Sequence, residues 1–111
     1  MRAYELMIIL NTELGDAEIQ ARLNRIDEQV AELNATVAST DKWGRRRFAY
    51  EINHMTEGFY VVLEIKSEVA LDEIERTLRL DDGVVRHKVL RLPDHEAERR
   101  GLLGDGAAAA S

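Results

Sequence analysis

Four segments of the chain have the apolar periodicity of β-strands. In residues 2–10 and 58–66, large apolar side chains occupy every second position, so each segment can bury one face of a pleated strand. The residues that share the buried parity are Tyr4, Leu6, Ile8, Leu10, Phe59, Val61, Leu63 and Ile65. Further strands are predicted over residues 35–52 and over residues 84–92, the latter ending before Pro93.

Two segments between these strands have the periodicity of amphipathic helices. In residues 16–33 the apolar positions are spaced by four and three, which makes one continuous stripe on a helix. This stripe consists of Ile19, Leu23, Ile26, Val30 and Leu33. A shorter helix at about 70–80 places Leu71, Ile74 and Leu78 on one side. The predicted order of elements is therefore β-α-β-β-α-β.

This order predicts an α+β protein with a ferredoxin-like fold, the split βαβ arrangement of a four-stranded antiparallel sheet. Right-handed crossovers place both helices on one face of the sheet and leave the other face uncovered. We assign this domain to residues 1–93. Residues 94–111 offer little to bury and are predicted to be a flexible C-terminal tail, although the segment EAERRGLL could become helical on a partner.

The strand predicted over residues 35–52 contains a conflict of parity. Val37 is odd-numbered, whereas Phe48, Tyr50 and Ile52 are even-numbered, and a regular pleat cannot bury both groups. A one-residue bulge would resolve the conflict, and Gly44 is its natural place because glycine accepts a left-handed backbone. Tyr4, Phe48 and Tyr50 are then expected in the core. After the bulge, Arg45 and Arg47 share the face opposite Phe48 and Tyr50.

The composition indicates a folded, soluble chain without candidate catalytic chemistry. The 111 residues include no cysteine, and His54, His87 and His95 lack the spacing of metal ligands. No glycine-rich phosphate loop or nucleophile motif is present, no apolar run is long enough to span a membrane, and the N-terminus lacks the pattern of a signal peptide. We therefore expect a cytoplasmic protein that is not an enzyme and has no cofactor, metal, membrane or small-molecule substrate.

The charge of the chain is distributed unevenly. The formal net charge is -6, and residues 16–33 and 68–82, which contain the predicted helices, carry local net charges of -3 and -4. Basic residues are instead concentrated in the segment DKWGRRRFAYEI, where Lys42 and three consecutive arginines follow one another closely. Because both helices are expected on one face, we expect the bases at the strand ends and on the other face of the sheet.

Four stretches of the chain, MRAYELMIIL, DKWGRRRFAYEI, EGFYVVLEI and LRLDDGVVRHKVLR, resemble the bacterial ribosomal protein S6 family. The resemblance covers about residues 1–92, and its most specific parts are Met-Arg-x-Tyr-Glu at the start and Trp-Gly-Arg-Arg-x-x-Ala-Tyr in the centre. The family commonly has proline where Glu51 stands here. The resemblance implies a ferredoxin-like, non-enzymatic protein of the small ribosomal subunit. It further implies binding to the central domain of 16S rRNA together with ribosomal protein S18.

The candidate RNA-binding residues are the bases of the strands, because arginine forms bidentate bonds with phosphate and stacks on exposed bases. This predicted set consists of Arg2, Lys42, Arg45, Arg46, Arg47, Arg86 and Lys88. About four phosphate contacts would give a salt slope of only about -3 to -4. We therefore expect the chain alone to bind RNA weakly and to need a more basic protein beside it. A charged surface ribbon that merely deters edge-to-edge association is the structural alternative.

A protein-binding surface is predicted on the helix-free face. Its candidate residues are Met7, Ile9, Trp43, Tyr60, Val62 and Leu90. Trp43 either covers the end of the sheet or packs on the partner. An RNA-recognition mode with bases stacked on Phe59 and Val61 is disfavoured, because the parity of these residues buries them. The alternative function is a ferredoxin-like small-ligand or homo-oligomerisation module whose uncovered sheet pairs with its own copy.

Overall fold

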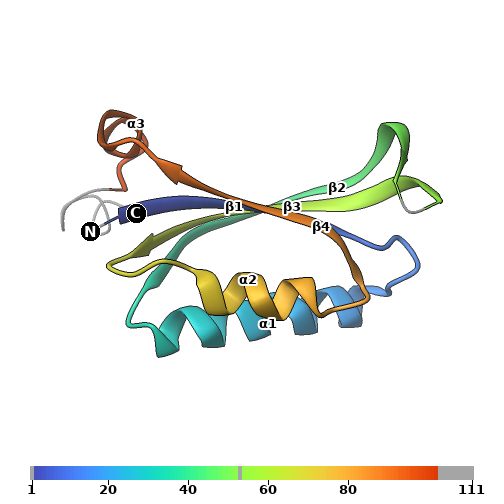
Figure 1. The fold of residues 1–111 in the computed structure, drawn as a ribbon, viewed down its shortest axis with the longest axis horizontal. Coiled ribbons are helices and arrows are strands. Elements are labelled where there is room, and N and C mark those ends of the chain that lie inside the picture. The colour runs from blue at the N-terminus through green and yellow to red at the C-terminus, as the bar shows by residue number, and fades with distance from the viewer. Residues whose placement is uncertain (1, 53, 103–111) are drawn as a thin grey trace.

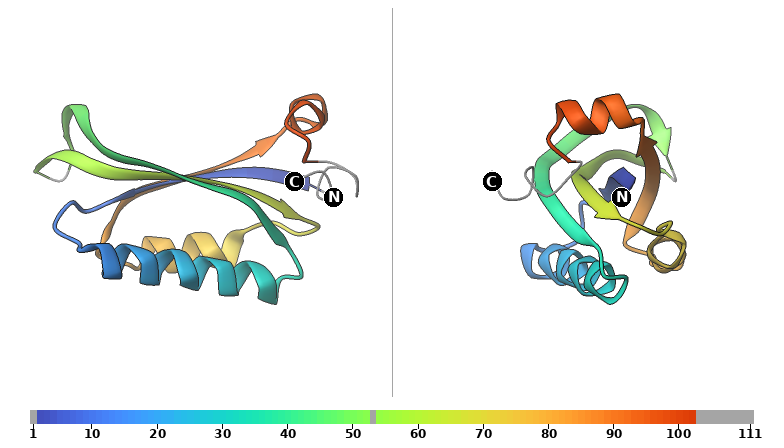
Figure 2. Two further views of the ribbon diagram at one scale, coloured as in Figure 1. Left: turned by 180° about the vertical axis from the view of Figure 1, so that it is seen from behind. Right: turned by 90° about the vertical axis from the view of Figure 1, so that its left-hand side faces the viewer.

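The computed structural model describes residues 2–52 and 54–102, which form a sheet with two helices on one side (Figure 1). The elements are β1 (Arg2–Leu10), α1 (Asp16–Glu32), β2 (Thr36–Ile52), β3 (Met55–Ser67), α2 (Asp72–Arg79), β4 (Val84–Leu92) and α3 (Asp94–Arg99). The strand order is β2-β3-β1-β4, and all three pairings are antiparallel. Helices α1 and α2 cover the same face of the sheet in both views of Figure 2. The predicted ferredoxin-like fold is therefore confirmed.

The core lies between this face and the two helices. The predicted parity of β1 and β3 is confirmed, since Leu6, Leu63 and Ile65 have no exposed surface. The buried members from the helices and their flanks are Ile19, Leu23, Ile26, Val30, Leu71, Ile74 and Leu78. The two amphipathic stripes thus supply one layer of the core, and alternate residues of the central strands supply the other.

Strand β2 contains two bulges before its arginines, where the sequence predicted one, and a third register shift between Arg47 and Ile52 near the hairpin tip. Val37 pairs with Ile65 and Ser39 with Glu64, so Ala38 is an extra residue. A second shift between Lys42 and Gly44 leaves Trp43 as the extra residue. Gly44 has a φ of 86°, which confirms the bulge predicted at this glycine.

The additional bulge at Ala38 changes the faces predicted for the residues that follow Gly44. Each bulge reverses the alternation of faces once, so two bulges together restore it, and Val37 and Phe48 lie on opposite faces of the sheet. The prediction that Phe48 and Tyr50 are core residues is therefore wrong. Phe48 is half-buried on the helix-free face beside Tyr60, and Tyr50 is 71% exposed. Tyr4, the third aromatic residue expected in the core, is buried there.

The chain after Pro93 forms a third helix. Ala97 and Leu102 are buried in a small cluster with Ala3 and Leu92. The expectation that this segment has little to bury is wrong for residues 94–102, and α3 forms without a partner chain. Helix α3 lies on the side of the sheet opposite α1 and α2 (Figure 1). The rest of the predicted tail, residues 103–111, lies outside the described residues, and the division of the chain at residue 93 stays a prediction.

Candidate nucleic-acid and protein interface

The helix-free face of the sheet brings together the six residues predicted to bind a protein. Strand register places Met7 opposite Val62 and Ile9 opposite Tyr60, and Leu90 lies opposite Glu5 on the next strand. Two depressions of about 340 and 250 Å³ lie on this face and share Met7 and Lys88 in their linings. Ile9 and Val62 are buried, whereas Leu90 is 48% exposed. An apolar floor with exposed apolar residues on its rim is typical of protein-binding surfaces.

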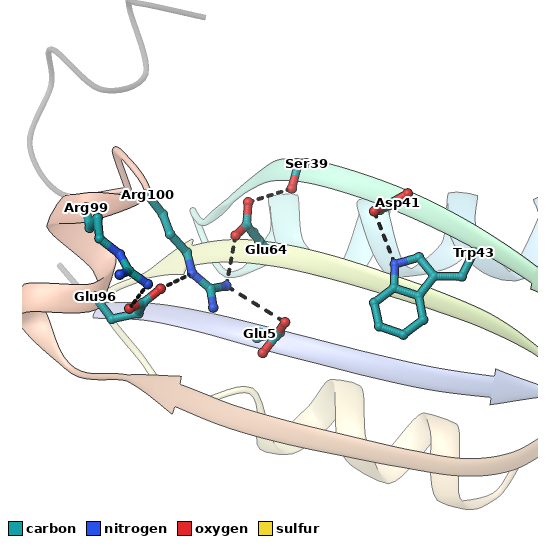
Figure 3. Close-up of polar contacts among 8 residues, drawn as sticks. All are labelled: Glu5, Ser39, Asp41, Trp43, Glu64, Glu96, Arg99 and Arg100. Atoms are coloured by element: carbon teal, nitrogen blue, oxygen red, sulfur yellow. Dashed lines mark hydrogen bonds and ion pairs between the residues drawn. The ribbon is translucent and has the colours of Figure 1, made fainter.

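Trp43 lies over the middle of this face. Its indole stacks almost parallel on Tyr60, with 6.1 Å between the ring centroids, and its Nε1 donates a hydrogen bond of 3.1 Å to Asp41. The guanidinium carbon of Arg46 lies 5.1 Å from the ring centroid, within range of a cation–π interaction. Figure 3 looks onto this face and shows the indole reaching from β2 across the neighbouring strand. The bulge at Trp43 therefore delivers an aromatic side chain to the face, and 44% of its surface remains exposed.

Gly58 allows the strands to pack closely on the same face. A Cβ atom at this position would collide with Ile9 and lie 2.8 Å from Cζ of Phe48. Any side chain here would push apart the apolar residues that cover β3. The neighbouring residues Phe59 and Val61 point the other way, since Val61 has no exposed surface and Phe59 packs against the core. Base stacking on these two side chains is therefore excluded by their position.

The structure divides the predicted RNA-binding residues between the two faces of the sheet. Arg46, Arg86 and Lys88 share the helix-free face, because they pair with Gly58, Ile9 and Met7 respectively. Arg45 pairs with Phe59 and Arg47 with Glu57, so both lie on the helix side of β2. The sequence predicted that Arg45 and Arg47 would lie on the face away from the helices. This prediction is wrong, because the bulge at Ala38 reverses the face of the residues that follow it.

Three bases on the helix side are held by nearby groups. Lys42 donates a hydrogen bond of 3.0 Å to Gln20 on α1, and Arg45 donates one of 3.4 Å to the carbonyl of Thr12. Arg2 donates to the Tyr4 hydroxyl at 3.2 Å, and this hydrogen bond raises the pKa of Arg2. By contrast, the side chains of Arg47, Arg86 and Lys88 make no hydrogen bond or ion pair with any described residue. Their charges are available to an anionic partner.

An ionic cluster that the sequence did not predict occupies the other end of the helix-free face. Glu5 and Glu64 are direct cross-strand neighbours, and Arg100 lies between them, with its Nη1 3.0 Å from Glu64 and 3.8 Å from Glu5. Its Nε donates to Glu96 at 2.7 Å (Figure 3). Hydrogen bonds from Arg100 and Arg99 lower the pKa of Glu96. Arg100 thus offsets the repulsion of two opposed carboxylates and ties α3 to the sheet.

The described residues contain no group of His, Asp and Glu side chains that could hold a metal ion. Among the same residues, no helix combines the length and the apolar character that crossing a bilayer requires. The acids and bases with perturbed pKa values, Arg2, Asp81, Glu96 and Arg100, are each paired with a neighbour in a structural contact. Apolar and cationic residues lie side by side on the helix-free face.

Comparisons with known proteins identify a family to which the sequence is similar over most of its length. The sequence model described as "Ribosomal protein S6" matches residues 3–91. "Small ribosomal subunit protein bS6" of Corynebacterium efficiens is 45% identical over 93 residues, which cover 83% of this chain and 98% of the relative. The protein of the same name from Desulforamulus reducens is 40% identical over 92 residues, which cover 82% of this chain and 97% of the relative.

A solved structure gives the same result for the fold. The crystal structure of 30S ribosomal protein S6 from Thermotoga maritima superposes with a TM-score of 0.80 at 28% identity, covering 89% of this chain and 94% of that one. These relatives are structural proteins of the ribosome, and the chain, like them, is not an enzyme and has its place in the cytoplasmic ribosome. The match from Ala3 to Arg91 includes both helices that cover the sheet and all four strands apart from their terminal residues Arg2 and Leu92. The chain therefore belongs to the ribosomal protein S6 family.

Proposed function

We propose that this chain binds the central domain of 16S rRNA, which forms the platform of the small subunit, together with ribosomal protein S18. The observation that carries the proposal is the run of three exposed arginines, Arg45–Arg47, on a strand that also borders the apolar helix-free face. Guanidinium groups suit phosphate and unpaired bases, and an apolar sheet face suits a protein. One narrow strand thus presents chemistry for both partners, which is the arrangement expected of a scaffold between RNA and protein.

The small number of available cations explains why a second protein is needed. The chain carries a net charge of -6, and the predicted RNA-binding set holds seven bases, of which Arg2, Lys42 and Arg45 already donate hydrogen bonds to groups of the chain itself. A footprint of about four phosphates gives weak, salt-sensitive binding. A more basic partner on the adjoining face would add phosphate contacts of its own. We expect the partner to tighten RNA binding by about tenfold or more, and equal affinity with and without it would refute this cooperation.

The test is a titration of a central-domain rRNA fragment with ribosomal protein S18 present. The variant Arg45→Ala/Arg46→Ala/Arg47→Ala should lose roughly tenfold or more in affinity and should lower the magnitude of the salt slope by about one for each phosphate contact removed. The matched control is Arg25→Ala/Arg76→Ala/Arg79→Ala, which removes the same charge from exposed positions of the two helices. The control should bind nearly as the wild type does. An unchanged affinity in the first variant would overturn the proposal.

A further inference from the structure

We propose that the sheet sorts its cations by face, so that Arg46, Arg86 and Lys88 bind a carboxylate of the partner protein while Arg45 and Arg47 bind the RNA backbone. This inference rests on the proposed function and divides the set of bases predicted to bind RNA. On this inference, the partner protein presents an acidic side chain next to an apolar one to the helix-free face.

Backbone alternation separates the neighbouring arginines of β2. Arg46 pairs with Gly58 and lies on the same face as Tyr60, whereas Arg45 pairs with Phe59 on the helix side. The guanidinium of Arg46 lies over the indole of Trp43, which holds it above the apolar floor. Arg45 instead donates to the carbonyl of Thr12 on the helix side. A single flat partner therefore cannot contact both side chains in the same way.

The surroundings of Arg46 favour protein over nucleic acid. Its face has an apolar floor, and its exposed apolar surface comes from Trp43 and Leu90, which are 44% and 48% accessible. Interface centres are enriched in tryptophan, tyrosine, methionine and arginine, and tryptophan, tyrosine and arginine contribute most to protein binding. An RNA backbone would leave this apolar surface in contact with water or phosphate. A protein side chain would bury it.

Charge complementarity identifies the group that the partner must present. Arg86 and Lys88 lie beside Ile9 and Met7 on the central strand, and they line the depression of about 340 Å³ together with those residues and Tyr60. Toward the other end of the face, Glu5 and Glu64 share a single cation, Arg100, and Glu5 lines the second depression together with Lys88. Among the described residues, the side chains of Arg86 and Lys88 form no ion pair. A partner carboxylate fits their end of the face, because it can pair with a fork of cations while a neighbouring apolar side chain enters the depression.

The first experiment compares two neighbouring single variants. Calorimetric titration with ribosomal protein S18 in the absence of RNA should show that Arg46→Ala weakens partner binding by roughly tenfold. Arg45→Ala should change it by less than about twofold, because the two variants remove the same charge from opposite faces. With saturating S18, titration of the rRNA fragment should give the reverse order, and Arg45→Ala should lower the magnitude of the salt slope by about one.

A second experiment tests the carboxylate. The variant Arg86→Glu/Lys88→Glu should bind S18 still more weakly than Arg46→Ala, and replacing one acidic residue of S18 by lysine should restore binding. Arg86 and Lys88 are exposed on an outer strand, so circular dichroism should show an unchanged fold. If no acidic residue of S18 gives this rescue, the carboxylate assignment is wrong.

The outcomes separate this inference from the proposed function. If Arg46→Ala leaves partner affinity unchanged, or weakens RNA binding as much as Arg45→Ala does at saturating S18, the sorting of cations by face is overturned. The proposed function stands in that case as long as the triple alanine variant still loses RNA affinity. If the triple variant loses none, the proposed function fails first.

Discussion

At the scale of single residues, one ion pair joins the two helices that cover the sheet. Arg22 of α1 donates two hydrogen bonds to Asp81, which follows α2, at 2.9 and 3.0 Å, and the amide of Gly83 donates a third at 2.8 Å. Burial alone favours the neutral carboxyl. The hydrogen bonds from Arg22 and Gly83 and the charges of Arg22 and Arg25 outweigh it and hold the pKa of Asp81 below its ordinary value.

This lowered pKa predicts how stability depends on pH. Because the folded state favours the carboxylate, the contribution of Asp81 is complete above the unfolded pKa of about 3.9 and is lost as pH falls through the folded pKa. We expect Asp81→Asn to lower the free energy of unfolding at neutral pH by about 1–2 kcal/mol. Urea unfolding should show the difference from wild type narrowing below about pH 4, and a constant difference would contradict this account.

The matched control for Asp81→Asn is Glu73→Gln. Glu73 contacts Arg76 at 4.0 Å, and both side chains are mostly exposed. Such a pair contributes little, so this variant should unfold within about 0.5 kcal/mol of the wild type at every pH. A comparable loss in both variants would mean that removal of any helix charge, rather than the bond between the helices, explains the effect.

At the scale of elements, β2 shows which features of a strand the sequence pattern can predict and which it cannot. The bulge at Gly44 was predictable because glycine accepts the positive φ found there, although the parity conflict that suggested the bulge rested on the wrong placement of Phe48 in the core. The bulge at Ala38 gave no signal, since its backbone is one that any residue adopts, and among the described residues only Asn34 and His54 have positive φ without being glycine. A single unrecognised residue therefore reversed the faces assigned to Phe48 and to the arginines beside it.

The candidate site was predictable to the same extent. The six apolar residues of the partner face follow from the alternation of β1, β3 and β4 and from the residues that flank Gly44, and the structure brings all six together. The division of the basic residues between the two faces could not be predicted from the sequence, because it depends on both bulges of β2. The cluster around Arg100 did not follow either, because α3 has six residues and is too short to show a helical period.

Arg100 adds an ionic contact to the apolar cluster that holds α3 to the sheet, and this predicts an effect of removing it. In Arg100→Ala, Glu5 and Glu64 would face each other without a cation between them. We expect the free energy of unfolding to fall by about 1 kcal/mol and the amides of α3 to exchange faster with solvent. Arg99→Ala is the matched control, because Arg99 bonds to Glu96 alone and is 77% exposed. Equal exchange in the two variants would contradict the role given to Arg100.

At the scale of the whole molecule, the two sides of the sheet are less different in charge than the sequence suggested. The acidic helices lie together on one face as expected (Figure 2). However, Lys42 and Arg45 contact groups on that side, and the helix-free face carries acids as well as bases. Positive charge is therefore concentrated at the rims of the sheet. An RNA and a partner protein can then approach the two rims of the sheet without passing over the acidic helices.

This distribution predicts that the protein is a monomer, which distinguishes it from the alternative of a homo-oligomerisation module. In a symmetric dimer through the helix-free face, residues near the twofold axis meet their own copies, so an axis at the end that holds Arg86 and Lys88 would bring equivalent cations together. Arg86 and Lys88 have no acid to neutralise them among the described residues, so this approach is repulsive at low salt. Light scattering at micromolar concentration should give 12.6 kDa at both low and high salt. Twice that mass, unchanged by salt and by added rRNA, would show that the apolar face serves a second copy of the chain instead of a ribosomal partner.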